Sequence, residues 1–365
     1  MKKNWYFETK VRIYTFNKLP ERNKKIKRKF MKAIVLKTQE SPLAFEDIEK
    51  PKPKTGEALV KLRAAALNHR DLWIRKGLYP NVKFPCVMGS DGAGVVEETG
   101  KGVDDFWLNK PVLINPALNW GDDRSGHGKD FEILGVPSQG TFAEYVCVPA
   151  ENLHEIPYGW NFEHAAALPL AGLTAHRALF YRGGLKAGQQ LLITGVGGGV
   201  ASFLLAFAIK TEAKVYVTSS SGEKIKKAME MGAVDGVNYQ KENWKDELKK
   251  KEPEGFDLIV DSAGGSQFPV LLELLRTGGR IVNFGGTAGK IPEIVPARIF
   301  WKQASILGTT MGSPADFESM MEFVSDLDLR PVIDKHFTLD SAEEAFRHLD
   351  NQSQFGKVII NIGNY

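Results

Sequence analysis

Cysteine is scarce in this chain: its 365 residues include only two, Cys86 and Cys147. Two thiols cannot form the disulfide framework that stabilises many small secreted proteins, and they cannot supply a four-thiolate metal site. We interpret both as ordinary buried residues. The scarcity indicates a reducing compartment, and we expect a cytoplasmic protein.

Long apolar runs are also missing, because no stretch approaches the roughly 18 consecutive apolar residues that a membrane-spanning helix needs. We therefore expect no membrane partner. There are no internal repeats. With 365 residues and 43% apolar content, the chain can bury a large core, and two domains are favoured over one.

Charge is distributed unevenly along the chain, because acidic residues are scarce in the first 30 residues and not in the remainder. Residues 1–30 contain 11 Lys or Arg and 2 Glu, whereas the remainder contains 37 basic and 42 acidic residues, so the net charge of +4 comes from this first segment. Such an arm can contact nucleic acid or a membrane surface. Residues 31–36, however, look like a fresh N-terminus that enters a first strand. We interpret residues 1–30 as an inert basic extension and expect no nucleic-acid partner.

The most informative segment is a glycine-rich turn. Residues 190–194 predict a strand, 195–201 have the spacing G-x-x-G-x-x-A, and 202–209 predict a buried helix. Glycine lets the backbone approach a ligand, and the helix N-terminus offers unpaired N–H groups and a partial positive charge to phosphates. The alternative is a tight turn that binds no ligand. The predicted contacts of a dinucleotide pyrophosphate are Gly195, Gly198, Gly199 and Val200.

Strands and helices alternate along the chain that follows. This alternation predicts a doubly wound parallel α/β sheet with helices on both faces, which binds its ligand beyond the carboxyl ends of the strands. The predicted strands are 214–218, 237–239, 256–261 and 280–284, and the predicted helices are 223–231 and 268–276. Cofactor contacts at these strand ends are expected from Ser219, Tyr239, Phe284 and Gly285.

The end of the second predicted strand indicates which dinucleotide binds. Proteins that bind NAD usually place Asp or Glu there to accept from the ribose 2′-hydroxyl. This chain has Ser219 and Ser220, followed by Lys224. Because hydroxyls and an ammonium suit a 2′-phosphate, we expect NADP(H). Two alternatives stay open: the serines cap the next helix, or Glu223 reaches the ribose if the loop is displaced by one residue.

The chain before and after the glycine turn has a different pattern. Short strands separated by proline and glycine, such as 58–62, 94–97 and 142–148, are typical of an all-β, partly closed barrel, and 356–361 predicts another such strand. Further motifs are residues 65–80 (AALNHRDLWIRKGLYP), 89–97 (GSDGAGVVE), 140–145 (GTFAEY), 167–175 (ALPLAGLTA) and 355–358 (FGKV). Together with the glycine turn, these motifs resemble the medium-chain dehydrogenase/reductase superfamily.

The resemblance covers the chain from Met31 to its C-terminus. It implies a GroES-like substrate domain formed by 31–155 and 300–365, a Rossmann domain formed by 156–299, and an active site in the cleft between them. It also implies a small-molecule substrate and a homodimer or homotetramer.

The chain departs from the zinc-dependent alcohol dehydrogenases of this superfamily at their metal ligands. Those enzymes have Cys-His where this chain has Asn68 and His69, and Gly-His-Glu where it has Gly89, Ser90 and Asp91. The lobe that holds a second, structural zinc in many relatives contains no cysteine here. We expect no zinc, and we interpret the other histidines as surface or packing residues.

The replaced ligands limit the predicted reaction. Oxidation of a simple alcohol needs a Lewis acid to stabilise the alkoxide, whereas reduction of a quinone or enone spreads the negative charge, so a few hydrogen bonds can stabilise it. The chain looks most similar to the zinc-free quinone oxidoreductase branch. We therefore predict hydride transfer from NADPH to a quinone, enone or related activated carbonyl.

The resemblance suggests roles for three residues. Asn68 would donate to the substrate or the nicotinamide ribose, and Thr174 would lie beside the nicotinamide. Tyr79 is either a proton donor or substrate contact, or an aromatic side chain that closes a turn beside Pro80. Two other functions stay open: a zinc-type alcohol dehydrogenase with unrecognised ligands, and a non-catalytic NADPH-binding protein.

Overall fold

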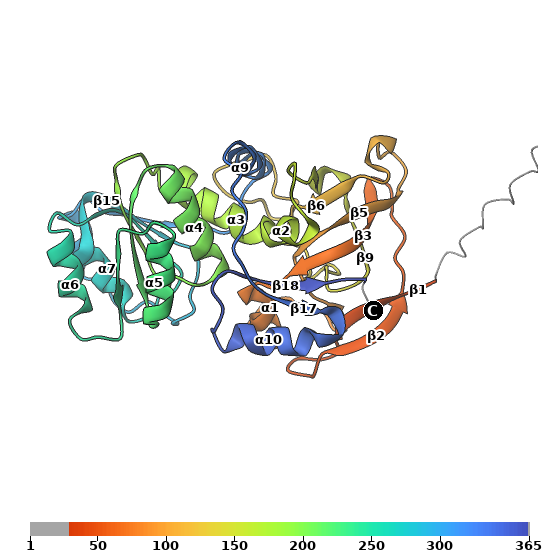
Figure 1. Ribbon diagram of the computed structural model, residues 1–365, viewed down its shortest axis with the longest axis horizontal. Coiled ribbons are helices and arrows are strands. Elements are labelled where there is room, and N and C mark those ends of the chain that lie inside the picture. Colours follow the sequence, from red (N-terminus) through yellow and green to blue (C-terminus); the bar gives the residue numbers. More distant parts are fainter. Residues whose placement is uncertain (1–28, 364–365) are drawn as a thin grey trace, which may run out of the picture.

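The computed structural model describes residues 29–363. Two lobes lie along the long axis of the molecule: one has a parallel sheet with helices around it, and the other is rich in antiparallel strands (Figure 1). The predicted basic extension lies outside the described residues except for Lys29 and Phe30, and Phe30 already belongs to the first strand. Within 29–363, no helix has the length and apolar character that crossing a membrane requires.

The first lobe is built on a six-stranded parallel sheet. Its order is β13-β12-β11-β14-β15-β16, so the chain starts in the middle and winds outward in both directions, which confirms the predicted doubly wound sheet. Every residue of β14 is buried, as expected for a strand with helices on both faces. The strands are β11 (Gln190–Ile193), β12 (Lys214–Ser219), β13 (Asp235–Asn238), β14 (Phe256–Asp261), β15 (Leu275–Asn283) and β16 (Ser305–Gly308).

The helices of this lobe connect its strands. One boundary differs from the prediction: the helix predicted over 268–276 ends at Leu274, because Leu275 already pairs with Phe256 at the start of β15. The helices are α4 (Gly199–Lys210), α5 (Gly222–Glu230), α6 (Trp244–Lys251), α7 (Phe268–Leu274) and α8 (Ala297–Phe300).

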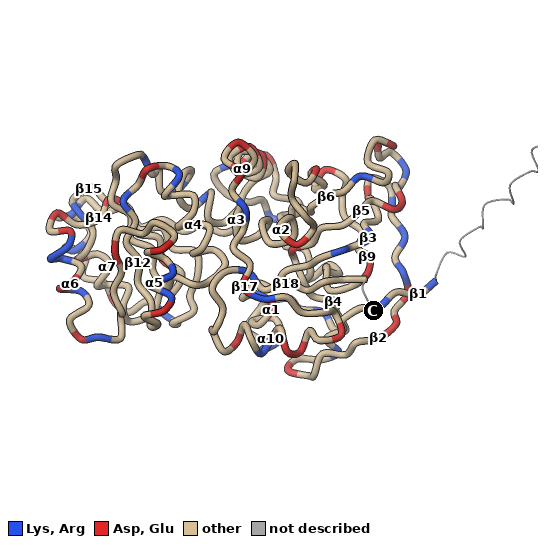
Figure 2. The backbone as a smooth tube through the Cα atoms, in the orientation of Figure 1, with Lys and Arg blue, Asp and Glu red and all other residues tan. Residues whose placement is uncertain are grey.

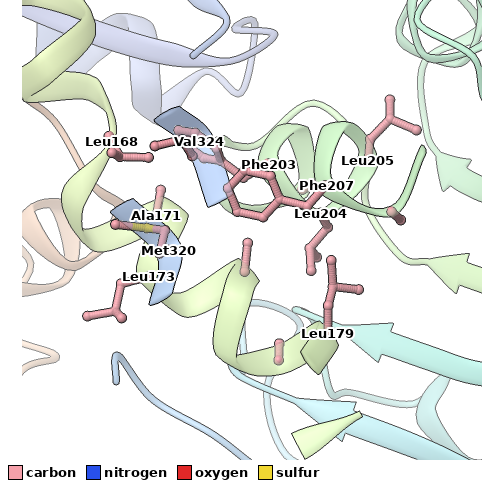
Figure 3. Close-up of a cluster of buried hydrophobic side chains, with 14 of the residues drawn as sticks. Leu168, Ala171, Leu173, Leu179, Phe203, Leu204, Leu205, Phe207, Met320 and Val324 are labelled. Carbon is pink, nitrogen blue, oxygen red and sulfur yellow. The ribbon is translucent and has the colours of Figure 1, made fainter. Parts of the chain in front are cut away.

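Three helices form the core between the lobes. Phe203 and Phe207 of α4 lie among side chains of α3 (Pro169–His176), which continues as a π-helical turn over Arg177–Arg182, and of α9 (Pro314–Asp326) (Figure 3). Burying one such side chain contributes about 1.5–3 kcal/mol. This packing fixes α4, and hence the glycine turn before it, relative to α3.

The second lobe is centred on strand β3. It pairs with β5 along one edge and with β9 and β18 along the other, so the lobe takes strands from both ends of the described chain. The strand predicted over 142–148 is shifted, because regular pairing begins only at Tyr145.

The elements of this lobe follow in chain order. The strands are β1 (Phe30–Leu36), β2 (Ala44–Glu49), β3 (Glu57–Ala66), β4 (Cys86–Val87), β5 (Asp91–Thr99), β6 (Pro111–Ile114), β7 (Ala117–Leu118), β8 (Glu132–Ile133), β9 (Tyr145–Pro149), β10 (Leu153–Glu155), β17 (Ile333–Thr338) and β18 (Lys357–Asn361). The α-helices are α1 (His69–Arg75), α2 (Phe162–Ala167) and α10 (Ala342–Asp350), and the 3-10 turns are Asp105–Trp107, Ala150–Asn152 and Leu339–Ser341.

Two elements lie across the predicted domain boundaries. Strand β16 pairs with β15 and extends the parallel sheet, so this domain continues past the predicted end at 299. Helix α2 packs against β3 and β5, although the prediction placed it in the Rossmann domain of 156–299. The strand or sheet that an element contacts decides its domain, and these contacts are not visible in the local sequence.

Charges are distributed over both lobes. Basic and acidic residues are interspersed along the tube in Figure 2, and this view shows no continuous basic stripe on the described part of the chain.

Candidate active site

The glycine turn joins β11 to α4 at the carboxyl edge of the parallel sheet. Gly195 and Gly197 have φ values of +68° and +123°, which glycine adopts without the strain of other residues. Gly198 is the N-cap of α4, and no side chain accepts a capping hydrogen bond there. Apart from its chain neighbours, a methyl group on Gly198 would meet no atom of the described residues within 4 Å. Gly199 and Val200 begin the helix, so this open turn, lined by first-turn N–H groups, fits a dinucleotide pyrophosphate.

Two lysine side chains from distant positions cross the turn. A Cβ on Gly197 would lie 2.6 Å from Cδ of Lys224, and a Cβ on Gly199 would lie 2.8 Å from Cδ of Lys357. The N–H of Gly356 donates to the carbonyl of Gly197 at 3.0 Å. Contacts with Lys224 in the same lobe and with Gly356 and Lys357 in the second lobe therefore favour small residues in the turn, apart from any requirement of a bound ligand.

The residues predicted to select the cofactor gather at the end of β12. Ser219 is buried and its Oγ accepts from the N–H of Ser221 at 3.2 Å, whereas Ser220 is exposed. The N–H of Tyr239 donates to the carbonyl of Ser219 at 3.2 Å. The hydroxyl that caps α5 belongs to Ser221, which accepts from the N–H of Lys224 at 3.4 Å. Ser220 is thus left exposed and is not used as the cap.

Lys224 has a second role that the sequence did not predict. Its Nζ donates to the carbonyl of Gln352, in the other lobe, at 2.6 Å. Burial lowers the pKa of this lysine. The ammonium expected at a 2′-phosphate therefore also connects α5 to the segment before β18, and Glu223 beside it is exposed.

Phe284 and Gly285 follow β15 at the same sheet edge. A Cβ on Gly285 would lie 2.6 Å from the carbonyl oxygen of Ser262, so the strand ends approach closely only with glycine here. The N–H of Phe284 donates to the carbonyl of Asp261 at 3.0 Å. The buried carboxylate of Asp261 accepts from Oγ1 of Thr194 at 2.7 Å, which connects β14 to the glycine turn.

Asn68 lies in a buried polar cluster with Asp91 and Lys357. Nζ of Lys357 donates to Oδ1 of Asn68 at 2.7 Å and to Oδ2 of Asp91 at 2.8 Å, and Nδ2 of Asn68 donates to the same Asp91 oxygen at 3.0 Å. The side chains of Lys357 and Asp91 are 2% and 0% exposed. The sequence analysis did not predict Lys357 as a site residue. The feature that could have indicated it is a lysine at the first position of an otherwise apolar C-terminal strand.

Thr174 lies on the helix that starts at this cluster. The second carboxylate oxygen of Asp91 accepts from the N–H of Leu170, in the first turn of α3, at 2.8 Å. One turn later Oγ1 of Thr174 donates to the carbonyl of Leu170 at 2.8 Å. Thr174 is buried, and its hydroxyl oxygen keeps an acceptor position for a ligand.

A second buried cation lies at the other replaced ligand position. One Nη of Arg70 donates to Oγ of Ser90 at 2.5 Å and to the carbonyl of Leu134 at 2.9 Å. The guanidinium also lies over the ring of Tyr79, with 4.8 Å between its central carbon and the ring centroid. The structure thus brings Tyr79 to Arg70, a residue that the sequence analysis did not single out. The sequence feature that could have indicated Arg70 is its position between His69 and Asp71 in the motif of residues 65–80.

Asp71 and His69 both lie in the first turn of helix α1. The Asp71 carboxylate accepts from the N–H of Asn68 at 2.8 Å and so fixes the N-terminus of the helix. Burial raises the pKa of Asp71 to about 6 and lowers the pKa of His69. Asp71 therefore positions the backbone that presents Asn68.

Two of the other histidines, His154 and His176, pack against aromatic rings. His154 lies 4.5 Å from the ring of Phe317 and His176 lies 4.8 Å from the ring of Phe180, between centroids, and burial lowers the pKa of each histidine to about 4. Over residues 29–363, no cluster of three or more His, Cys, Asp or Glu side chains is placed to hold a metal.

Comparison with known proteins agrees with this architecture. The family model described as alcohol dehydrogenase GroES-like domain matches residues 54–158, and the one described as zinc-binding dehydrogenase matches residues 199–326. The zinc-type alcohol dehydrogenase-like protein YogA of Leptosphaeria maculans is 36% identical over 340 residues, which cover 88% of this chain and 95% of that protein.

Two further similarities point the same way. The quinone oxidoreductase of Homo sapiens is 28% identical over 324 residues, 86% of this chain and 92% of its own length. A crystal structure of an NAD-dependent alcohol dehydrogenase superposes with a TM-score of 0.84 at 36% identity, covering 91% of this chain and all of that one. The chain therefore belongs to the medium-chain dehydrogenase/reductase superfamily, whose members are nicotinamide-dependent oxidoreductases.

Proposed function

We propose that the protein transfers a hydride from NADPH to a quinone, an enone or a related activated carbonyl, and that no catalytic metal takes part. The proposal rests on the groups at the two positions where zinc-dependent members have a thiolate and an imidazole. Here Asn68 accepts from Lys357, and Ser90 accepts from Arg70. An amide and a hydroxyl that are bonded to buried cations are poor zinc ligands, because protein zinc sites use thiolate, imidazole or carboxylate.

These groups suit the stabilisation of a delocalised anion. The reduced nicotinamide supplies the hydride when it is bound. The amide of Asn68 is held by Lys357 and Asp91, so its orientation is fixed before a substrate arrives. Fixed donors of this kind stabilise charge that develops on a substrate oxygen without reorganising. The similarity to a quinone oxidoreductase supports the same substrate class.

The cofactor assignment rests on the residues at the sheet edge. The turn of Gly195, Gly198, Gly199 and Val200 would hold the pyrophosphate, and Thr174, Phe284 and Gly285 would lie beside the nicotinamide half. Ser219, Ser220 and Tyr239 would hold the adenosine half, with Lys224 at the 2′-phosphate. The similar crystal structure is of an NAD-dependent enzyme, so the ratio of KM values for NADPH and NADH is the test.

The decisive experiment follows cofactor absorbance with a panel of quinones, enones and simple alcohols, with and without a chelator. We expect reduction of quinones or enones that a chelator does not affect. The competing function is zinc-dependent alcohol oxidation, which the name of the relative at 36% identity favours. Chelator-sensitive alcohol oxidation would replace our proposal with that function, and tight cofactor binding without turnover on any acceptor would indicate a non-catalytic binding protein.

We also propose, from the family resemblance, that the protein is a homodimer or a homotetramer. Sedimentation velocity across a range of protein concentrations tests this, and a single monomeric species at micromolar concentration would contradict it.

A further inference from the structure

Three Lys or Arg side chains are buried in the described part of the chain, and Arg70 differs from the other two. Lys357 pairs with Asp91, and Arg177 pairs with Asp316, whose carboxylate is fully buried. Arg70 is only 8% exposed, yet no carboxylate oxygen of residues 29–363 lies within 4.0 Å of its guanidinium nitrogens, the limit for a salt bridge. Buried cations are normally paired, because an uncompensated charge away from water is costly.

The guanidinium of Arg70 also keeps donors unused. Its Nε and one Nη are buried and make no hydrogen bond to any residue that the structure describes. The other Nη is occupied by Ser90 and the carbonyl of Leu134. The nearby Asp71 carboxylate accepts from the N–H of Asn68 and does not form an ion pair with Arg70. The Asp71 carboxylate balances part of this charge from beyond salt-bridge distance, and the two buried N–H groups remain without an acceptor among the described residues.

The position of Arg70 connects these free donors to the candidate site. Arg70 follows Asn68 by two residues at the start of α1, and it contacts Ser90 directly. Asn68 and Ser90 occupy the two replaced zinc-ligand positions. The ring of Tyr79 lies against the guanidinium, which limits access of water from that side.

We propose that Arg70, together with Ser90 and Tyr79, forms an oxyanion-binding subsite for the carbonyl oxygen of the substrate. This inference rests on the proposed function. It identifies the charged group that stabilises the enolate or hydroquinone anion formed by hydride transfer. A guanidinium remains protonated and presents two N–H groups in one plane, which suits a delocalised enolate or hydroquinone anion.

The electron count fits an anion at this subsite. An enone that accepts a hydride at its β carbon gains one C–H bond, its C=C electron pair moves toward the carbonyl, and the oxygen becomes an enolate. A proton from water at the α carbon then gives the saturated ketone. A quinone that accepts a hydride becomes a hydroquinone monoanion, which takes one proton from water. In both cases the negative charge on oxygen is transient, and Arg70 would bind it before the proton arrives.

A phenol probe tests the subsite without turnover. 4-Nitrophenol is titrated in the presence of the full-length protein saturated with NADP⁺, and the phenolate absorption band reports its ionisation. We expect the wild-type protein to bind the phenolate more tightly than the phenol, so the bound probe has a lower apparent pKa than the free probe. Equal affinity for the two forms in the wild-type protein overturns the inference.

Two substitutions at Arg70 and one control locate the effect. Arg70→Met should abolish the preference for phenolate and lower kcat for an enone or quinone by about 100- to 1,000-fold, the loss typical of a removed oxyanion donor. Arg70→Lys should retain part of the preference, because it keeps the charge. Arg75→Met is the matched control: Arg75 is on the same helix but pairs with Glu343, so both readouts should stay at wild-type values.

The outcomes separate this inference from the proposed function. Circular dichroism and NADPH binding show whether each variant folds; if Arg70→Met does not fold, Arg70→Lys and the wild-type titration still decide. If the wild-type protein reduces quinones or enones and Arg70→Met does so with an unchanged kcat, the subsite is contradicted and the proposed function stays intact. A phenolate preference that depends on Arg70, in a protein that reduces no acceptor, supports the subsite and contradicts the proposed function.

Discussion

The ammonium of Lys357 lies 2.8 Å from the carboxylate of Asp91, although the two residues are 266 positions apart in the chain. Both side chains are almost completely buried, and both also bond to Asn68. Strand β18, strand β5 and the start of α1 therefore meet at one ion pair. This pair fixes the amide that the proposed reaction uses.

Lys357→Met should destabilise the protein strongly, because it leaves the Asp91 carboxylate buried and unpaired. We expect a loss of about 3–5 kcal/mol in the free energy of unfolding, as for other broken buried ion pairs. The double variant Lys357→Met/Asp91→Asn should recover part of this loss, since no uncompensated charge remains. Urea denaturation of both variants measures the difference. If the double variant is no more stable than the single one, burial of the unpaired charge is not the cause.

Two alanine substitutions in the glycine turn should affect different properties, cofactor affinity in one variant and stability in the other. Gly198→Ala introduces a methyl group that meets no atom of the described residues beyond its chain neighbours within 4 Å, so the free energy of unfolding should stay within about 0.5 kcal/mol of wild type. The same methyl group should obstruct the pyrophosphate and weaken cofactor binding at least about tenfold, a loss of about 1.4 kcal/mol.

Gly197→Ala is the contrasting variant. Its φ of +123° and its contact with Lys224 should cost about 1–3 kcal/mol of stability. Thermal denaturation and a cofactor titration measure the two effects. Unchanged cofactor affinity in Gly198→Ala would mean that the pyrophosphate binds elsewhere.

Lys224→Ala should reduce the preference for NADPH. Loss of one charge-assisted hydrogen bond of about 1.5–3 kcal/mol should raise KM for NADPH at least about tenfold, with a smaller change for NADH. Lys226→Ala on the same helix is the control, because Lys226 is 80% exposed and lies 3.9 Å from Glu230. Equal increases in KM for both cofactors would show that Lys224 acts only through its bond to Gln352.

Asp71 should make stability depend on pH. Burial raises the pKa of its carboxyl from the ordinary 3.8 to about 6, so the folded protein holds this proton more tightly than the unfolded chain. The resulting stabilisation is fully present below 3.8 and is lost as the pH rises through about 6. Relative to wild type, Asp71→Asn should therefore gain about 2 kcal/mol between pH 4.5 and 7.5. Urea denaturation at the two pH values tests this, and a difference that does not change with pH would rule it out.

Local patterns in the sequence predicted the secondary structure of the candidate cofactor site. The glycine spacing after an apolar strand placed Gly195, Gly198 and Val200 at a helix start, and the end of the next strand placed Ser219 and Ser220 beside them. These predictions succeed because a strand, turn and helix in succession are encoded by consecutive residues. The domain boundaries were less accurate, since β16 and α2 belong with partners that are distant in sequence.

The sequence by itself determined the fold family, the glycine turn and the replacement of two metal-ligand residues by Asn68 and Ser90, because each is written in contiguous residues. The tertiary structure alone showed that buried Lys357 and Arg70 donate hydrogen bonds to the side chains at these two positions. Of these two cations, only Lys357 lies within salt-bridge distance of a carboxylate of residues 29–363. Charge compensation depends on distances between side chains from separate elements. Such distances exist only once α1, β5 and β18 have packed together.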